Sequence, residues 1–138
     1  MKSTTVEKNH ALDNAKAHLE DIIKMHTKTI LAASIDEAEE IEEEARQDVL
    51  SVEIRSNCWQ SVGTELTATQ ARLVLTVGGP GLQLVFDLDQ NNQPSTDLEL
   101  QYQDWFKPWT GYWPENQKDI EEAKQALEWF AGLFFYGE

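Results

Sequence analysis

The side chains most able to do chemistry in this 138-residue chain are carboxylates, and they are concentrated in one segment. The formal net charge is −14, and residues 36–48 hold eight acids and one arginine, which is half of the excess negative charge. A charge of this sign repels nucleic acid and anionic membranes, and it speeds encounter with basic proteins. The carboxylates therefore predict binding to a basic surface more strongly than they predict catalysis.

The histidines and the cysteine are poorly placed for metal binding or nucleophilic catalysis. His10, His18 and His26 follow one another at intervals of eight residues, so on an α-helix each is rotated by about 80° from the previous one. Cys58 is the single cysteine, which excludes an internal disulfide and fits a reducing cytoplasm. We expect no metal, no cofactor and no enzymatic activity.

A second cluster, rich in aromatic rings, spans residues 104–114. Two prolines and a glycine interrupt it, which predicts a loop rather than a helix. Most of its rings are expected to close one end of the core, while one or two serve as anchors for a partner, a role in which Trp is common. The candidate anchors are Trp105, Trp109 and Trp113.

Two helices are predicted in the N-terminal part of the chain, and the second one carries the acids. Apolar residues recur at spacings of three and four from Leu12 to Ile30, which predicts a first helix over 12–33 with a narrow seam. Such a seam needs a partner, either the next helix or another copy of the chain in a homodimer. Ser34 followed by Glu37 is a capping-box pattern that begins a second helix over 35–49. The candidate partner-binding acids on this helix are Asp36, Glu37, Glu39, Glu40, Glu43 and Glu44.

The rest of the chain alternates apolar and polar residues with a period of two. Segments 52–55, 72–77, 82–88 and 98–103 predict an antiparallel meander of three or four strands with one buried face. Asn116 caps a last helix over 117–130, which is expected to pack on one face of the sheet. The predicted fold class is α+β, with a helical arm or hairpin at 1–50 and an α+β core domain at 51–138.

Several motifs in residues 51–138 resemble a family of small proteins carried by phages and other mobile elements of bacteria. The matching segments are Ser51–Ser56 with Trp59, Val77–Pro80, Leu98–Trp105 with Pro108–Thr110, and Phe134–Glu138. Where the family has glycine after its Gln-Asp-Trp motif, this chain has Phe106. The resemblance implies an accessory protein of a mobile element, and it carries over no catalytic residues.

Small acidic proteins of mobile elements often block host defences by presenting carboxylates where a defence complex binds DNA phosphates. The expected function is therefore anti-CRISPR or anti-restriction inhibition in the cytoplasm of the bacterial host, by a DNA mimic that binds a basic protein surface and no nucleic acid. No apolar run approaches the ~18 residues of a membrane span, which fits a soluble protein. One alternative is a structural or assembly protein that dimerises through the helix at 12–30. The other is a small-ligand binder or enzyme that uses the aromatic loop at 104–114.

Overall fold

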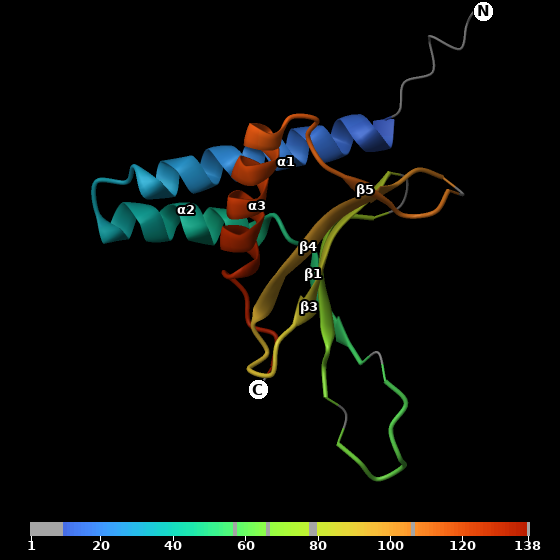
Figure 1. Cartoon of the computed structure of the whole chain (residues 1–138). Coiled ribbons are helices and arrows are strands. Elements are labelled where there is room, and N and C mark those ends of the chain that lie inside the picture. The colour runs from blue at the N-terminus through green and yellow to red at the C-terminus, as the bar shows by residue number, and fades with distance from the viewer. Residues whose placement is uncertain (1–9, 57, 66, 78–79, 106, 138) are drawn as a thin grey trace, which may run out of the picture.

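The computed structural model describes residues 10–137, apart from residues 57, 66, 78–79 and 106 (Figure 1). The described residues form three helices, which are α1 (His10–Ile30), α2 (Ile35–Gln47) and α3 (Gln117–Ala131). The same residues form five strands, which are β1 (Ser51–Arg55), β2 (Gln70–Thr76), β3 (Gly81–Leu88), β4 (Pro94–Gln103) and β5 (Thr110–Tyr112). The predicted α+β class is confirmed.

The strands form one antiparallel sheet in the order β1-β2-β3-β4-β5. The meander is thus confirmed, but it has five strands instead of the three or four that the pattern predicted. The additional strand is β5, which lies inside the predicted loop 104–114 and pairs with β4 through Thr110, Gly111 and Tyr112. Three residues are too few to show a period of two, so only the pairing with β4 reveals this strand.

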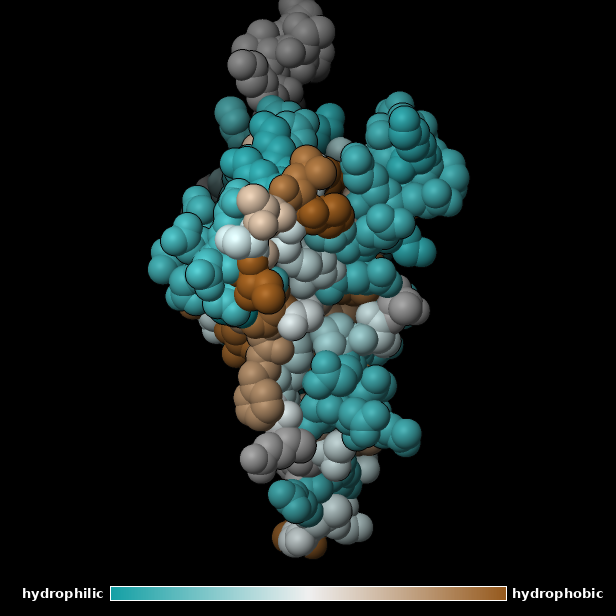
Figure 2. Space-filling view, turned by 90° about the vertical axis from the view of Figure 1, so that its left-hand side faces the viewer, coloured by the Kyte–Doolittle hydropathy of each residue, from teal (hydrophilic) through white to brown (hydrophobic). Residues whose placement is uncertain are grey.

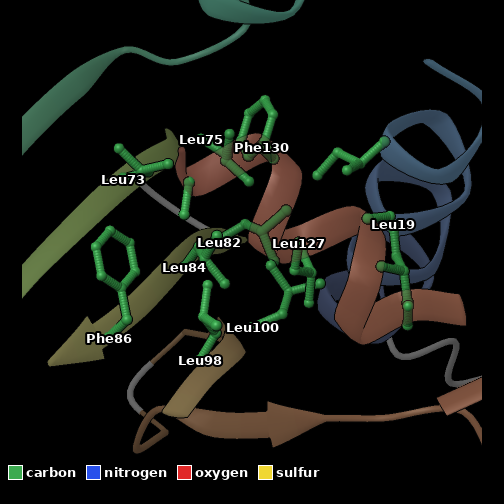
Figure 3. Close-up of a cluster of buried hydrophobic side chains, with 14 of the residues drawn as sticks. Leu19, Leu73, Leu75, Leu82, Leu84, Phe86, Leu98, Leu100, Leu127 and Phe130 are labelled. Carbon is green, nitrogen blue, oxygen red and sulfur yellow. The ribbon is translucent and has the colours of Figure 1, made fainter. Parts of the chain in front are cut away.

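One face of the sheet carries the hydrophobic core. Alternate residues of the strands point to this face in register, so that Leu73 lies opposite Leu84 and Leu84 lies opposite Leu100. The helices α1 and α3 add Leu19 and Leu127 to the same cluster (Figure 3). Each buried leucine contributes on the order of 2 kcal/mol of transfer free energy, which fastens the helices to the sheet. The helices of residues 1–50 and the sheet of residues 51–138 therefore share one core.

The apolar seam of α1 is largely buried within the chain. Ala15, Leu19 and Ile22 are at most 3% exposed and belong to the core cluster. α2 runs back alongside α1 as the second arm of a helical hairpin, so the next helix supplies part of the cover that the seam requires (Figure 1). Ile30, at the end of the seam, remains 68% exposed.

Both predicted helix starts are confirmed by their caps. The hydroxyl of Ser34 accepts a hydrogen bond from the backbone N–H of Glu37 at 3.1 Å. The side-chain oxygen of Asn116 accepts one from the backbone N–H of Asp119 at 2.9 Å. Each bond satisfies a backbone donor that has no partner within the first helical turn, which defines where α2 and α3 begin.

The C-terminal segment is docked on the core. Tyr136 is buried, its hydroxyl donates to the carbonyl of Ala131 at 2.6 Å, and its ring meets the edge of Phe86 at 5.2 Å. Burial raises the pKa of the Tyr136 phenol, so the side chain stays neutral and keeps this hydrogen bond.

Candidate protein-binding site

α2 presents its acids to solvent because its thin apolar side faces inward. Ala45 is fully buried, and Ala38 and Ile41 are half-buried. Positions three and four apart lie on the same face of a helix, so residues 36, 40 and 43 form one line on the opposite side. Six exposed carboxylates on and beside this line form what we call the acidic surface: Asp36, Glu37, Glu39, Glu40, Glu43 and Glu44. All six acids predicted to bind a partner are therefore brought together.

The chain neutralises only part of the acidic surface. Arg46 pairs with Glu43 at 3.1 Å, and Glu37 accepts a hydrogen bond from the backbone N–H of Ala33 at 3.1 Å. The remaining carboxylates have no hydrogen bond or ion pair with another described residue: Asp36, Glu39, Glu40 and Glu44. These four carboxylates are free to accept hydrogen bonds from a partner.

Neighbouring carboxylates affect the pKa of Asp48, the C-cap of α2. Burial is the main cause that raises the pKa of Asp48, and the carboxylates of Asp21 and Glu44 raise it further. The side chain of His18 acts in the opposite direction. The negative charges of Asp21 on α1 and Glu44 on α2 therefore both act on Asp48.

The three predicted tryptophan anchors have different environments. Trp105 is 62% exposed and Trp109 is 38% exposed, whereas Trp113 is partly buried and packs against the core. Of the three, Trp105 and Trp109 are thus the rings with substantial surface in contact with solvent. α2 and β5 lie on opposite sides of the molecule, so these rings and the acidic surface do not form a single site (Figure 1).

The face of the sheet opposite the core carries a chain of hydrogen bonds, which we call the polar network. It consists of Glu53, Arg72, Gln83, Gln101 and Glu99, contributed by β1 to β4. Arg72 donates to Glu53 at 2.7 Å and to Gln83 at 3.1 Å. Gln83 then donates to Gln101 at 2.8 Å, and Gln101 donates to Glu99 at 2.7 Å. Each link joins side chains on neighbouring strands or two residues apart on one strand, so the register of the sheet determines the network.

The polar network borders a hollow of about 530 Å³ beside Trp109. Hydrogen bonds from Arg72 and then Ser51 hold the pKa of Glu53 below its usual range, so this carboxylate stays charged as an acceptor. Because the polar groups already pair with one another, a polar ligand in the hollow competes with internal hydrogen bonds. Gln83 is only 5% exposed, which further indicates that the network stabilises the sheet.

The histidines lie in separate environments. His26 on α1 stacks against Trp129 of α3 with 5.4 Å between ring centroids, and burial lowers the pKa of its imidazole. His18 instead lies within the field of Asp48. Within the described part of the chain, no three His, Cys, Asp or Glu side chains are grouped so that they could hold a metal ion. None of the helices described above is both long and apolar enough to cross a membrane.

Two exposed apolar segments are not anticipated by the sequence patterns. The loop between β1 and β2 projects from the sheet, and its Trp59 and Val62 are fully exposed (Figure 1). The connection between α1 and α2 exposes Ile30, Leu31 and Ile35 to between 68% and 77%. Figure 2, which views this side of the molecule, shows hydrophobic surface flanked by hydrophilic surface. The β1–β2 loop lies outside any regular element, whereas Ile30 and Ile35 are the last residue of α1 and the first residue of α2, so the apolar period does not reveal their exposure.

Comparison of the chain with protein-family models, with curated protein sequences and with solved structures gives no match in any of the three. The surfaces described above are therefore the basis for assigning a function.

Proposed function

We propose that the protein is an acidic inhibitor that occupies a basic, nucleic-acid-binding surface of a host defence complex of the CRISPR or restriction kind. The observation that carries this proposal is the charge density of the acidic surface. Its six exposed carboxylates lie within residues 36–44, which is about 12 Å of helix, or roughly one charge per 2 Å. Duplex DNA carries one charge per about 1.7 Å of its axis. A groove of Arg and Lys that holds a DNA backbone can therefore hold α2.

The carboxylates of α2 also have the chemistry that such a groove requires. A carboxylate accepts two parallel hydrogen bonds from one guanidinium, as a phosphate does. Asp36, Glu39, Glu40 and Glu44 are not engaged within the described chain, so no internal bond is lost when a partner binds. The Ser34 cap and the burial of Ala45 keep the helix ordered before binding, which limits the entropic cost.

The charge of the whole protein supports a basic protein as the partner. A net charge of −14 accelerates association with a positive surface and repels nucleic acid itself. The resemblance of residues 51–138 to mobile-element proteins supports an accessory role in phages or other mobile elements, acting in the bacterial cytoplasm.

The test compares two variants that change the net charge equally. One neutralises the acidic surface with Glu39→Gln, Glu40→Gln and Glu44→Gln. The matched control neutralises three exposed acids elsewhere, with Glu65→Gln, Asp97→Asn and Glu128→Gln. The readout is DNA binding by a panel of purified CRISPR and restriction complexes in the presence of each protein.

The parent protein and the control are expected to inhibit one of these complexes with similar potency. The α2 variant is expected to be at least about tenfold weaker at low salt, because it lacks three of the charges that contact the groove. Inhibition that survives the α2 substitutions would rule out α2 as the DNA mimic. Equal losses in both variants would show a general effect of charge.

A further inference from the structure

The two edges of the sheet differ in how they are protected. An exposed edge strand offers unpaired backbone groups to another chain, and proteins usually protect such an edge with short strands and prolines. β5 follows this rule, since it has three residues between Pro108 and Pro114. β1 has no proline and exposes a row of aliphatic side chains. Leu50, Val52 and Ile54 are 61%, 40% and 51% exposed.

The exposed row of β1 lies on the core side of the sheet. Val52 pairs with Leu73 and Ile54 with Ala71, and both of these partners are buried in the core. The helices do not cover the row, because α1 and α3 pack mainly over β3 and β4. β1 therefore extends the apolar face of the sheet beyond the cover that this chain supplies.

The charges of β1 complement a second copy of the same strand. Glu53 and Arg55 lie on the face opposite Ile54, two residues apart. If two β1 strands pair antiparallel with Ile54 opposite Ile54, each Glu53 lies opposite the Arg55 of the other copy. Opposite charges then meet across the strands, beside the hydrogen bonds that Glu53 already accepts from Arg72 and that Arg55 already donates to Gln70. If the axis is instead at residue 53, the two Glu53 side chains oppose each other, which is unfavourable. Of these two registers, charge favours the one with Ile54 at the axis.

We propose that β1 pairs antiparallel with β1 of a second copy, with the two-fold axis at Ile54, to form a homodimer with a continuous ten-stranded sheet. An axis perpendicular to the sheet keeps the core faces of both copies on the same side, so Ile54 meets Ile54 and lies diagonally next to Val52 of the other copy. This surface is separate from the α1 seam, which is largely buried within the chain. The proposal is independent of the partner of α2.

A symmetric disulfide tests the register directly. Opposed residues of antiparallel strands have Cα atoms about 4.5 to 5.5 Å apart, within the range that a disulfide bridges. In a Cys58→Ser background, which removes the exposed native thiol, Ile54→Cys is expected to form a disulfide-linked dimer on mild oxidation. Val52→Cys is the matched control, because the two copies of residue 52 would be about 13 Å apart in this register. Equal crosslinking of both variants, or none at residue 54, would overturn the proposal.

A charge exchange tests the same pairing without a covalent bond. Glu53→Lys and Arg55→Glu each place like charges opposite one another in a homodimer, so each variant alone is expected to dimerise at least about tenfold more weakly. An equimolar mixture places opposite charges together and is expected to recover the dimer. Light scattering distinguishes a 15.8 kDa monomer from a dimer of twice this mass, and thermal unfolding checks that Glu53→Lys still folds without its Arg72 partner. A parent protein that stays monomeric up to about 500 μM, or a mixture that behaves like its components, would contradict the pairing.

Discussion

The acidic surface of α2 and the polar network of the sheet contain similar polar side chains, but they use them in opposite ways. In the network, Arg72 and Gln83 link side chains of neighbouring strands, so that donors and acceptors satisfy each other. On α2, four of the six exposed carboxylates have no partner among the described residues. Polar groups that pair internally contribute to the stability of the fold, whereas unpaired charges are available to another molecule.

The comparison shows that exposure alone does not identify a binding surface. Glu53 and Glu40 are both accessible acids, but only Glu40 retains its full capacity to accept hydrogen bonds. Substitutions in the network should therefore change the free energy of unfolding, and substitutions on α2 should change binding with little effect on stability.

The largest stability effect is expected at the centre of the network. Gln83→Ala removes two side-chain hydrogen bonds from a residue that is 5% exposed, and it should lower the free energy of unfolding by about 2 kcal/mol. Gln47→Ala is the matched change on the exposed side of α2, and it should have an effect within about 0.5 kcal/mol. Urea unfolding of both variants measures the difference. Equal changes in the free energy of unfolding would show that the polar network does not stabilise the fold more than the exposed side of α2 does.

A smaller effect is expected where the network passes over β5. A Cβ at Gly111 would lie 2.7 Å from the Glu99 carboxyl group, so Gly111→Ala must shift the Glu99 side chain, which weakens its hydrogen bond with Gln101 and should cost up to about 1 kcal/mol. At Gly132, the C-cap of α3, φ is −71° and the nearest atoms are 3.4 Å from a built Cβ, so Gly132→Ala should be neutral or slightly stabilising. Thermal unfolding compares the two variants. A stabilising Gly111→Ala would show that Glu99 is not held over β5.

Neutralising α2 should stabilise the protein slightly. Like charges four residues apart, such as Glu39 with Glu43 and Glu40 with Glu44, each cost a few tenths of a kcal/mol. The triple variant Glu39→Gln, Glu40→Gln and Glu44→Gln should therefore gain about 0.5 kcal/mol in the free energy of unfolding. A loss of stability in urea unfolding would mean that these carboxylates have internal partners, contrary to the comparison.

The smallest effects are opposite responses to pH. Glu53 has a pKa held below the usual 4.5, so its contribution to stability is present above that value and is lost as the pH falls further. Asp48 has a pKa raised above the usual 3.8, so its contribution is present at low pH and is lost as the pH rises through the raised pKa. As the pH rises from 3 to 6, Glu53→Gln should thus become less stable relative to the parent protein, as measured by urea midpoints. Over the same rise in pH, Asp48→Asn should become more stable relative to the parent protein, by a few tenths of a kcal/mol. If the stability difference from the parent changed with pH in the same direction for both variants, the opposite pKa shifts of Glu53 and Asp48 would be wrong.

Local sequence patterns predict most of the helices and strands. The features that they do not predict depend on contacts between residues far apart in the sequence. Ser34 and Asn116 could be recognised because capping depends on residues three positions away. Arg72 and Gln83 are eleven residues apart, and their hydrogen bond depends on the register between β2 and β3, which no local pattern specifies. Trp113 could not be distinguished from the exposed rings of its loop because packing against the core, not sequence spacing, buries it.

The acidic surface was predictable for the same reason as the caps. A helix with a thin apolar stripe must present its other residues to solvent, so the exposure of the acids follows from the pattern between 35 and 49. Asp36, Glu39, Glu40 and Glu44 have no partner among the described residues, and this does not follow from the pattern, because it depends on which cations the fold brings near. Arg46 is the one basic residue of the segment, and it pairs with Glu42 and Glu43.

The salt dependence of inhibition tests most directly whether α2 acts in place of a DNA backbone. It is measured as the concentration of protein that releases DNA from the inhibited defence complex, between about 50 and 500 mM salt, for the parent, the triple α2 variant and the charge-matched control. The parent and the control should both lose potency steeply as salt rises, while the α2 variant should start weaker and change less. A salt dependence that is identical in all three proteins would show that α2 does not act in place of a DNA backbone.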